Sequence, residues 1–426
     1  MGHKNFKWFK LDNAAKIYPA SHSKSWSNLY RMSATLNEDV DLKILNQALK
    51  NTIPRFPSIA ARLAEGLFWY YLLPVETPPA IMSEYSYPLS HMSKKEMKTC
   101  AFRVIVYKKR IALEIFHALT DGTGGIIFLK TLVAEYLELK HGIEIPCEKG
   151  VLSRKEPPKH EEIEDSFLKN AAPVKETRKD TNAWKIDGTP EEDSYLNITN
   201  FQIASDSVLK LAKEKNVTVN TYLAAVMMKA ILTLQLDLVH DPKKLMPVKL
   251  LIPINLRSLF ESQTLRNFTL YVIPELDPRL GEYTLDEIIS IVHHKMGITA
   301  TKKNMAKMIE TNVSDERNMV LRLVPLFIKN VVMKMVFNAV GEKKSCLSFT
   351  NLGIINFPDI MKPYIKRFDC ILTHQAQAPY NCSVYTYDGI LNVTFSRNIK
   401  EARLETYFFR ELQSLGIEAT VQSNQR

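Results

Sequence analysis

Cysteine is scarce in this 426-residue chain, and its five cysteines stand far apart, at positions 100, 147, 346, 370 and 382. An odd number of cysteines without a C-x-x-C pair argues against a disulfide framework and against a zinc ribbon. The sequence therefore predicts reduced thiols, a cytoplasmic location and a stability that comes from a large apolar core.

Long uninterrupted apolar runs and a leader segment are also missing. The first residues, MGHKNFKWFKLDN, contain no apolar stretch of the kind that a signal peptide needs. Lys229 interrupts the apolar run 222–234, and the run 319–340 contains an arginine, a proline and two lysines. We therefore expect no membrane-spanning helix.

Acidic residues are fewer than basic ones, 46 against 56, which gives a net charge of +10. Such a balance is compatible with nucleic acid, anionic lipid, a phosphate-bearing small molecule or simple solubility. The basic residues are scattered without interleaved aromatics, which disfavours nucleic acid. The H-E-x-x-H, Walker A and G-x-S-x-G patterns are absent, so we expect no metal and no ATP chemistry.

Strand and helix patterns alternate through both halves of the chain. Hydrophobic periodicity predicts strands over 26–36, 67–73, 102–107, 111–117, 248–254, 267–273, 346–350, 368–373, 383–387 and 391–396. It predicts helices from an Asp39 cap to Pro54, and over 123–139, 205–215 (capped by Ser205 or Asp206), 220–234, 286–310, 318–340 and 401–415. Residues 421–426 are expected to be frayed.

A change of composition separates the two halves. From about residue 143 to residue 195 the chain is rich in proline, lysine and glutamate, with one short helix predicted near 162–170. The expected organisation is an α+β domain over 1–145, a crossover linker over 146–195 and a second α+β domain over 196–426.

The most informative motif is FHALTDGTGG, residues 116–125. His117 closes a predicted strand, where a general base can face a cavity and take a hydroxyl or amine proton near neutral pH. Gly122 allows a tight turn and a close approach to a ligand. The N-terminal amides of the helix that follows are candidates for stabilising developing negative charge. The alternative is a buried histidine followed by an aspartate that only caps the helix.

The motif resembles the H-x-x-x-D-G signature of the chloramphenicol-acetyltransferase-like superfamily, which includes condensation domains and alcohol acetyltransferases. PINLR, residues 253–257, resembles the N-x-R segment of condensation domains, and SFTNLG, residues 348–353, resembles a strand of the alcohol acetyltransferase branch. The run 39–66, with RFP at 55–57, is also similar. The motifs occur in the family's order and touch both halves of the chain.

The resemblance implies a fold and a set of roles. The fold would be two chloramphenicol-acetyltransferase-like domains in a V-shaped pseudo-dimer with an active-site tunnel between them. His117 would be the catalytic base, Asp121 and Gly122 would support it, and Arg257 would pair with Asp121. Thr350 and Asn351 lie where an oxyanion donor or a substrate contact is possible, although ordinary strand polarity explains them equally well.

The implied activity is transfer of an acyl group, acetyl being one candidate, from acyl-CoA to an alcohol or amine, by a monomer without a permanently bound cofactor. One alternative is a condensation-type protein that accepts acyl groups from an acyl carrier protein. Phe116 replaces the first histidine of the H-H-x-x-x-D-G form, which weakens the peptide-bond-forming interpretation. The other alternative is a non-catalytic binding relative. Of the other histidines, His293 and His294 are expected at the surface and His374 is a candidate for a cavity wall.

Overall fold

The computed structural model describes residues 8–23, 26–84, 87–171, 181–317, 323–340, 342–375 and 378–425. The first part of the chain contains β1 (Phe9–Lys10), α1 (Ile17–Ser21), β2 (Leu29–Leu36), α2 (Leu42–Thr52), β3 (Ala61–Glu65), β4 (Tyr70–Pro74), β5 (Met82–Ser83), α3 (Lys94–Thr99), β6 (Phe102–Tyr107), β7 (Arg110–Phe116) and α4 (Gly122–His141). The crossover contains α5 (His160–Ile163) and α6 (Ser166–Lys169).

The second part begins with β8 (Asn197–Ala204), α7 (Ser205–Glu214), α8 (Val219–Leu238), β9 (Val248–Asn255), α9 (Arg257–Phe260), β10 (Thr269–Val272) and β11 (Glu275–Leu276). It continues with α10 (Leu285–Thr299), α11 (Lys302–Arg317), α13 (Leu326–Val340), β12 (Leu347–Ile354), β13 (Ile365–Leu372), β14 (Tyr380–Tyr387), β15 (Ile390–Arg397), α14 (Arg403–Ser414) and β16 (Thr420–Ser423).

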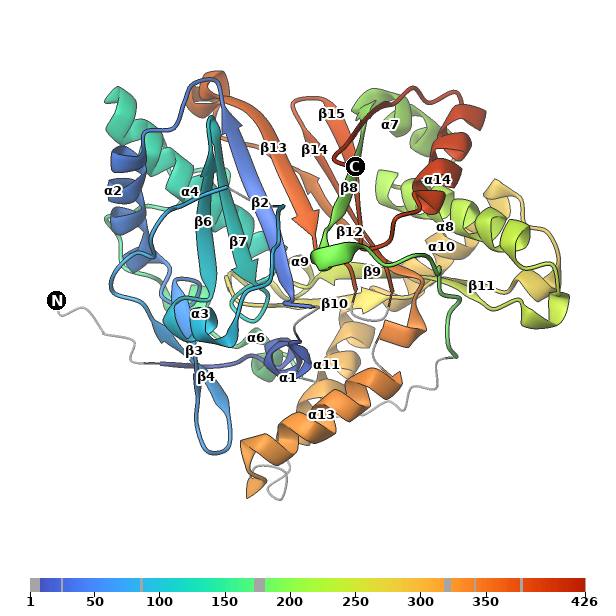
Figure 1. The fold of residues 1–426 in the computed structure, drawn as a ribbon, viewed down its shortest axis with the longest axis horizontal. Helices are drawn as coiled ribbons and strands as arrows, with labels where there is room; N and C mark the ends of the chain where they lie inside the picture. The colour runs from blue at the N-terminus through green and yellow to red at the C-terminus, as the bar shows by residue number, and fades with distance from the viewer. Residues whose placement is uncertain are drawn as a thin grey trace.

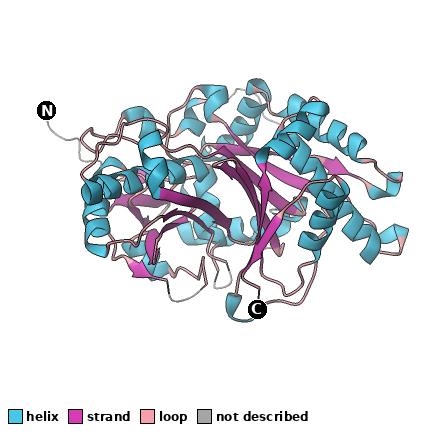
Figure 2. Cartoon of the chain, turned by 90° about the horizontal axis from the view of Figure 1, so that it is seen from above, coloured by secondary structure: helices cyan, strands magenta, loops and turns pink. Residues whose placement is uncertain are grey.

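The described strands form two large sheets and a small one. The first large sheet has the order β13-β2-β7-β6-β5, and the second runs β10-β9-β12-β14-β15-β8-β16 with β11 beside β9. The small sheet is β1-β4-β3. Figure 1 shows the two large sheets side by side, with α2 and α4 outside the first and α8, α10 and α14 outside the second. Figure 2 shows the same arrangement from above, with most strands inside and most helices outside.

The strand and helix that flank the motif follow directly from their sequences. On β7 the alternate residues Ile111, Leu113 and Ile115 are fully buried, as their period of two predicts. They belong to the hydrophobic core that packs around the first large sheet, called the first core below. Helix α4 begins after its cap Asp121 and ends at His141, which is followed by Gly142 with a left-handed φ of 65°. His117 therefore directly follows the last residue of a buried strand, and a short loop joins it to a buried helix.

Several predicted details are wrong. Asp41, not Asp39, caps α2, and Ala204 precedes α7 without a side-chain cap, although Ser205 or Asp206 was expected there. The predicted helix 286–310 is two helices, α10 and α11, separated at Ala300 and Thr301. The tail is ordered where fraying was expected, because β16 pairs antiparallel with β8. Of the predicted helix 318–340, residues 318–322 lie outside the described residues.

One strand of the second part completes the sheet of the first. β13 pairs antiparallel with β2 from Ile365–Leu36 to Leu372–Tyr30. The first core accordingly includes side chains as late in the chain as Phe368 and Tyr387. The two large sheets therefore do not divide at the predicted crossover, and the boundaries at 145 and 195 stay predictions.

Helix α8 is long and apolar enough to cross a membrane, but 72% of its most apolar window is buried inside the protein. It packs against α10 and α14, as a core helix does. All five cysteines are free, and Cys147 alone among them is exposed.

Candidate active site

A cavity of about 400 Å³ lies between the two large sheets. His117 lines it together with side chains from α1, β2, α4, β9, β10, β12 and β13. Both parts of the chain therefore contribute to its wall. This arrangement gives a small molecule access to the histidine at the end of β7.

Hydrogen bonds around His117 fix its tautomer. Nδ1 lies 3.2 Å from Oδ1 of Asn267. The Nδ2 group of Asn267 donates to the His117 carbonyl at 3.0 Å and to Oδ2 of Asp12 at 3.3 Å. The amide orientation therefore makes Oδ1 an acceptor, and Nδ1 must carry the proton. In the neutral ring Nε2 is left with its lone pair, as a general base requires.

Aromatic rings hold the imidazole from two sides. Tyr18 of α1 stacks on it with ring centres 4.8 Å apart, and Tyr30 of β2 lies edge-on at 5.1 Å. Burial lowers the pKa of His117 below 6.5, although its own carbonyl, Asp121 and Asn267 each act to raise the pKa. The ring is therefore neutral, and able to accept a proton, throughout the neutral pH range.

Asn267 and Asp12 are site residues that sequence reasoning missed. Asn267 is nearly fully buried, as is Asp12, which also accepts the Ala15 main-chain N–H at 2.8 Å. Burial raises the pKa of Asp12 to about 6, and the nearby Arg266 guanidinium opposes that rise. In the sequence, Asn267 stands out only as part of an N-x-T sequon, whereas the structure makes it the hydrogen-bond partner of the histidine.

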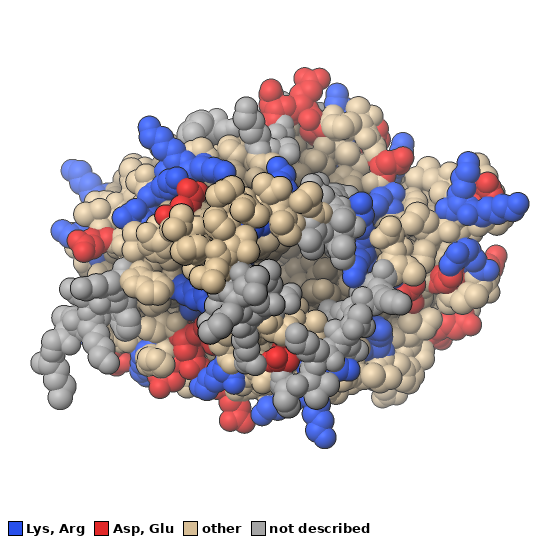
Figure 3. All heavy atoms as spheres, turned by 90° about the horizontal axis from the view of Figure 1, so that it is seen from below, with Lys and Arg blue, Asp and Glu red and all other residues tan. Residues whose placement is uncertain are grey.

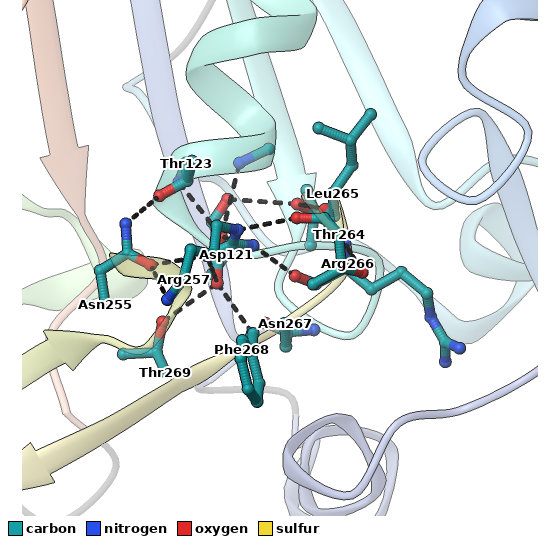
Figure 4. A network of polar contacts seen from close by, with 12 residues as sticks. Asp121, Thr123, Asn255, Arg257, Thr264, Leu265, Arg266, Asn267, Phe268 and Thr269 are labelled. Atoms are coloured by element: carbon teal, nitrogen blue, oxygen red, sulfur yellow. Dashed lines mark hydrogen bonds and ion pairs between the residues drawn. The ribbon is translucent and has the colours of Figure 1, made fainter. Parts of the chain in front are cut away.

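The ion pair expected between Asp121 and Arg257 is present (Figure 4). The guanidinium contacts both carboxylate oxygens, at 2.9 and 3.0 Å, which is a bidentate geometry. Oδ2 of Asp121 also accepts the Phe268 main-chain N–H at 2.9 Å and the Thr269 hydroxyl at 3.0 Å. Arg257 in turn donates to the main-chain carbonyl of Thr264 at 2.7 Å. The pair thus ties the start of α4 to the β9–β10 region of the second part.

The Asp121 carboxylate also accepts hydrogen bonds from main-chain amides in the first turn of α4. Oδ1 of Asp121 accepts the N–H groups of Thr123 and Gly124, at 3.1 and 3.4 Å. Two of the amides expected to face developing negative charge, those of Thr123 and Gly124, are therefore already bonded to Asp121. For the Gly122 amide the expectation stays a prediction. Burial acts to raise the pKa of Asp121, but Arg257 and the hydrogen bonds outweigh it and hold the pKa below 3.8.

The glycines of the motif allow other parts of the chain to pack closely against the start of α4. Gly122 is the first residue of α4 and has no positive φ, and a Cβ there would come 2.9 Å from the Leu352 side chain. At Gly124 a Cβ would lie 2.0 Å from Oγ1 of Thr120 and 2.3 Å from the Leu265 carbonyl oxygen. The second part of the chain therefore approaches the start of α4 too closely for a side chain.

We expect Gly124→Ala to destabilise the protein by about 1–3 kcal/mol, because overpacking at this contact forces the backbone apart. Gly297→Ala is the matched control, since Gly297 is an exposed helical glycine of α10 with no atom within 4 Å of a Cβ. The control should be neutral or gain up to about 1 kcal/mol. Urea unfolding of the two variants measures the difference, and equal stability of both would contradict the close approach.

Thr350 and Asn351 of β12 both line the cavity. Nδ2 of Asn351 donates to Oδ1 of Asn220 at 3.2 Å, while its Oδ1 accepts the Gly353 main-chain N–H at 2.8 Å. The Thr350 hydroxyl lies 3.5 Å from the Ser348 hydroxyl. Both residues are thus placed at the cavity wall, and each keeps a donor hydrogen that these contacts do not require.

The other three histidines for which the sequence gives an expectation lie where it places them. His374 lines the cavity, and its main-chain carbonyl accepts Nε1–H of Trp26 at 2.9 Å. His293 and His294 are exposed on α10. Cys370 also lines the cavity, but burial raises the pKa of its thiol to about 12, so it stays protonated.

No family model matches the chain, and no curated protein matches it in sequence. Solved structures match over nearly its whole length. One is the TRI3 trichothecene 15-O-acetyltransferase from Fusarium sporotrichioides, with a TM-score of 0.58, 10% identity, and coverage of 97% of this chain and 98% of that one. TRI101 from F. sporotrichioides, complexed with coenzyme A and T-2, matches with a TM-score of 0.60 and 9% identity, over 97% and 99%.

A third is the starter condensation domain of rhizomide synthetase RzmA, in complex with C8-CoA and Leu-SNAC. It matches with a TM-score of 0.59 and 11% identity, over 96% of this chain and 94% of that one. Identities this low establish the fold alone. The chain therefore has the mixed helix-and-sheet, two-domain fold of the chloramphenicol-acetyltransferase-like acyltransferases and condensation domains, as the order of its three motifs predicts.

Proposed function

We propose that the protein is an acyltransferase that moves an acyl group from a CoA thioester to an alcohol or amine, with His117 as general base. The observation that carries this proposal is that Nδ1 of His117 faces Oδ1 of Asn267 at 3.2 Å, at the wall of the cavity. With Nδ1 donating to that oxygen, Nε2 is the nitrogen that takes a proton from the acceptor substrate. The fold shared with TRI3, an O-acetyltransferase, supports the same reaction class.

In the proposed reaction, Nε2 of His117 removes the hydroxyl or amine proton as the oxygen or nitrogen attacks the thioester carbonyl. The tetrahedral intermediate then collapses, the carbon–sulfur bond breaks, and the imidazolium returns the proton to the departing thiolate. The products are an ester or amide and free CoA. Thr350 and Asn351 are proposed to stabilise the oxyanion from the cavity wall.

Direct transfer is favoured over a covalent acyl-enzyme. Cys370 is the cysteine that lines the cavity, and its raised pKa keeps the thiol protonated. A thiolate, not a thiol, is the nucleophile in such chemistry. We further propose that the protein acts as a monomer in the cytoplasm.

The test is a screen of acyl-CoA donors against small alcohols and amines, followed by the release of free thiol. Acyl-carrier-protein donors belong in the same assay, because the condensation domain of RzmA matches this chain as well as TRI101 does. Thiol release from acyl-CoA, dependent on an acceptor, supports the proposal. Release from carrier-bound donors alone would favour the condensation-type alternative. A chain that binds no CoA thioester in calorimetry would favour a non-catalytic relative.

The pH profile should report the lowered pKa of His117. A general base works in its neutral form, which predominates above its pKa. Because burial brings the pKa of His117 below 6.5, kcat/KM should be level at neutral pH and fall only in more acidic solution. The measurement is kcat/KM against pH, with an acid inflection expected below 6.5. An inflection above 7 would contradict this assignment of the base.

We expect Asn267→Ala to lower kcat by about 10- to 100-fold, because the ring loses the contact that fixes its tautomer and position. The acid inflection should also move to lower pH, since Asn267 acts to raise the pKa of His117. Asn392→Ala is the matched control, a buried asparagine of β15 that bonds to Asn200 outside the cavity. An unchanged inflection would show that Asn267 plays only a packing role.

A further inference from the structure

Gln375 carries a buried polar atom for which the described part of the protein supplies no partner. The residue lies just after β13, is only 6% exposed and lines the His117 cavity. Its Oε1 is buried and accepts no hydrogen bond from any described group. A buried acceptor of this kind lowers stability, so its presence calls for an explanation. Of the described residues with such an atom, Gln375 is the one that lines this cavity.

The main chain around Gln375 is held in place by hydrogen bonds. The Gln375 carbonyl accepts Nδ1–H of His374 at 2.7 Å, and the His374 carbonyl accepts Nε1–H of Trp26 at 2.9 Å. Nδ2 of Asn381 donates to the main-chain carbonyl of Thr373 at 2.9 Å. All three bonds end on main-chain oxygens. They therefore fix where the Gln375 side chain starts without engaging its amide.

The amide of Gln375 can present either of its polar groups to the cavity. Rotation about the last side-chain bond of a glutamine crosses only broad energy wells. A half turn exchanges Oε1 with Nε2, so the amide can accept a hydrogen bond from a ligand or donate one. Hydroxyl and amide groups also both donate and accept, which makes them suitable partners for this side chain.

Gln375 and His117 approach the cavity from opposite sides of β2, which lies between β7 and β13 in the first large sheet. The His117 main-chain N–H donates to the Asn28 carbonyl at 3.0 Å, and the Thr373 main-chain N–H donates to the Leu29 carbonyl at 3.4 Å. Two strand spacings separate the main chains of the two segments by roughly 10 Å. A ligand group bound by Gln375 therefore lies only a few bonds from the atom that reacts at His117.

The wall of the cavity is largely uncharged. Asp121 is the one acidic side chain among the described residues of the wall, and Arg257 and hydrogen bonds take both of its oxygens. The described wall contains no lysine or arginine. The lower face of the molecule likewise has a broad uncharged area that is hollowed near its middle (Figure 3). Because burying an unpaired charge is costly, an uncharged ligand group fits this cavity best.

We propose that Gln375 is a specificity-determining residue that binds an uncharged hydroxyl or amide group of a substrate. This assignment rests on the proposed acyltransferase function. Two substrates can supply such a group. One is an acceptor that carries a second hydroxyl, and the other is the acyl donor, whose pantetheine arm contains amides. In either case the Gln375 amide gains its hydrogen-bond partner only when that substrate is bound.

The test replaces Gln375 by leucine, which has a similar size and forms no side-chain hydrogen bond. KM is measured for acyl-CoA, for a diol acceptor and for the matching mono-alcohol. We expect KM to rise about 3- to 10-fold for the substrate that contacts Gln375, with kcat little changed. A rise for acyl-CoA with every acceptor identifies an amide of the donor, and a rise for the diol alone identifies its second hydroxyl. Three unchanged KM values would overturn the proposal.

Stability without substrate separates this role from packing. Gln375→Leu should unfold at the same or a higher denaturant concentration than the wild type, because it removes an unpaired buried amide. Gln235→Leu is the matched control, since Gln235 of α8 is fully buried, donates to the Met246 carbonyl at 3.0 Å and accepts the Met246 N–H at 2.8 Å. The control should unfold earlier and keep its KM values. Equal destabilisation by the two changes would mean that Gln375 already has a partner within the protein, against the proposal.

The uncharged class of ligand is tested by comparing the diol with an amino alcohol in which an ammonium group replaces the second hydroxyl. The amino alcohol should have the higher KM at neutral pH, and a lower KM would contradict the assigned class. Failure of the reaction is distinguishable from failure of this assignment. A wild-type protein that releases no thiol with any acceptor contradicts the acyltransferase proposal. Thiol release with unchanged KM values in the Gln375→Leu variant contradicts only the role of Gln375.

Discussion

Replacing His117 by Ala is expected to lower turnover by about 10²- to 10⁴-fold, which is the usual contribution of a positioned general base. The fold should survive, because the ring lies at the wall of the cavity and is only part-buried. Thiol release gives the turnover, and the melting temperature and the affinity for CoA report on the fold and on binding. A large fall in kcat with little change in CoA affinity identifies a group that acts in the chemical step.

His293→Ala is the control for this experiment, since His293 is an exposed histidine of α10 away from the cavity. It should keep full activity. Near-wild-type turnover of the His117→Ala variant would mean that another group, or water, removes the acceptor proton, and the proposed mechanism would then be wrong. His117→Gln adds a second check, because glutamine keeps hydrogen-bonding capacity but cannot accept the proton.

The second large effect is expected on stability. Arg257→Ala should cost about 3–5 kcal/mol, because it leaves the buried carboxylate of Asp121 without its bidentate partner. The loss also releases the Thr264 and Arg266 carbonyls that the guanidinium holds. Activity should fall with stability, since Asn267 immediately follows this segment. Denaturant unfolding measures the cost.

Arg279→Ala is the matched control, because Arg279 makes the same kind of bidentate contact to Asp277 at an exposed site. It should cost less than about 1 kcal/mol. Adding Asp121→Ala to Arg257→Ala should recover part of the loss, because no charge is then stranded. A single Arg257→Ala variant as stable as the control would contradict the role given to the pair.

The pair of Asp121 and Arg257 should also make the stability of the protein depend on pH. The folded-state pKa of Asp121 lies below 3.8, so its stabilising effect is complete at neutral pH and is lost only as the pH falls below that value. In the Arg257→Ala variant this acid dependence should weaken, because the partner that lowers the pKa is gone.

Local patterns in the sequence predict the elements around the site. The period of two in β7, the cap at Asp121 and the apolar face of α4 are all visible within a short window, and the structure has them within one or two residues. The turn between β14 and β15 is equally local, since Asp388 and Gly389 both have the positive φ that a tight hairpin requires. The pairing of Asp121 with Arg257 comes from the family resemblance.

Contacts between distant segments could not be predicted in the same way. Asn267 lies 150 residues from His117 along the chain, and its contact with Nδ1 depends on how the β10 region meets the end of β7. The need for a glycine at position 124 likewise depends on Leu265, whose main chain approaches from the second part of the chain. Thr301, which bonds to the Asn304 main-chain N–H, separates two helices whose apolar residues continue one pattern.

The pairing of the late strand β13 with the early strand β2 has a consequence for folding during synthesis. Strand β2 is synthesised early, but its partner on one side, residues 365–372, is among the later segments to leave the ribosome. Until then β2 presents an open edge of a kind that promotes misassembly between nascent chains. Helper proteins that shield such edges should therefore raise the yield of this protein in the cell, and fragments that stop before residue 365 should aggregate.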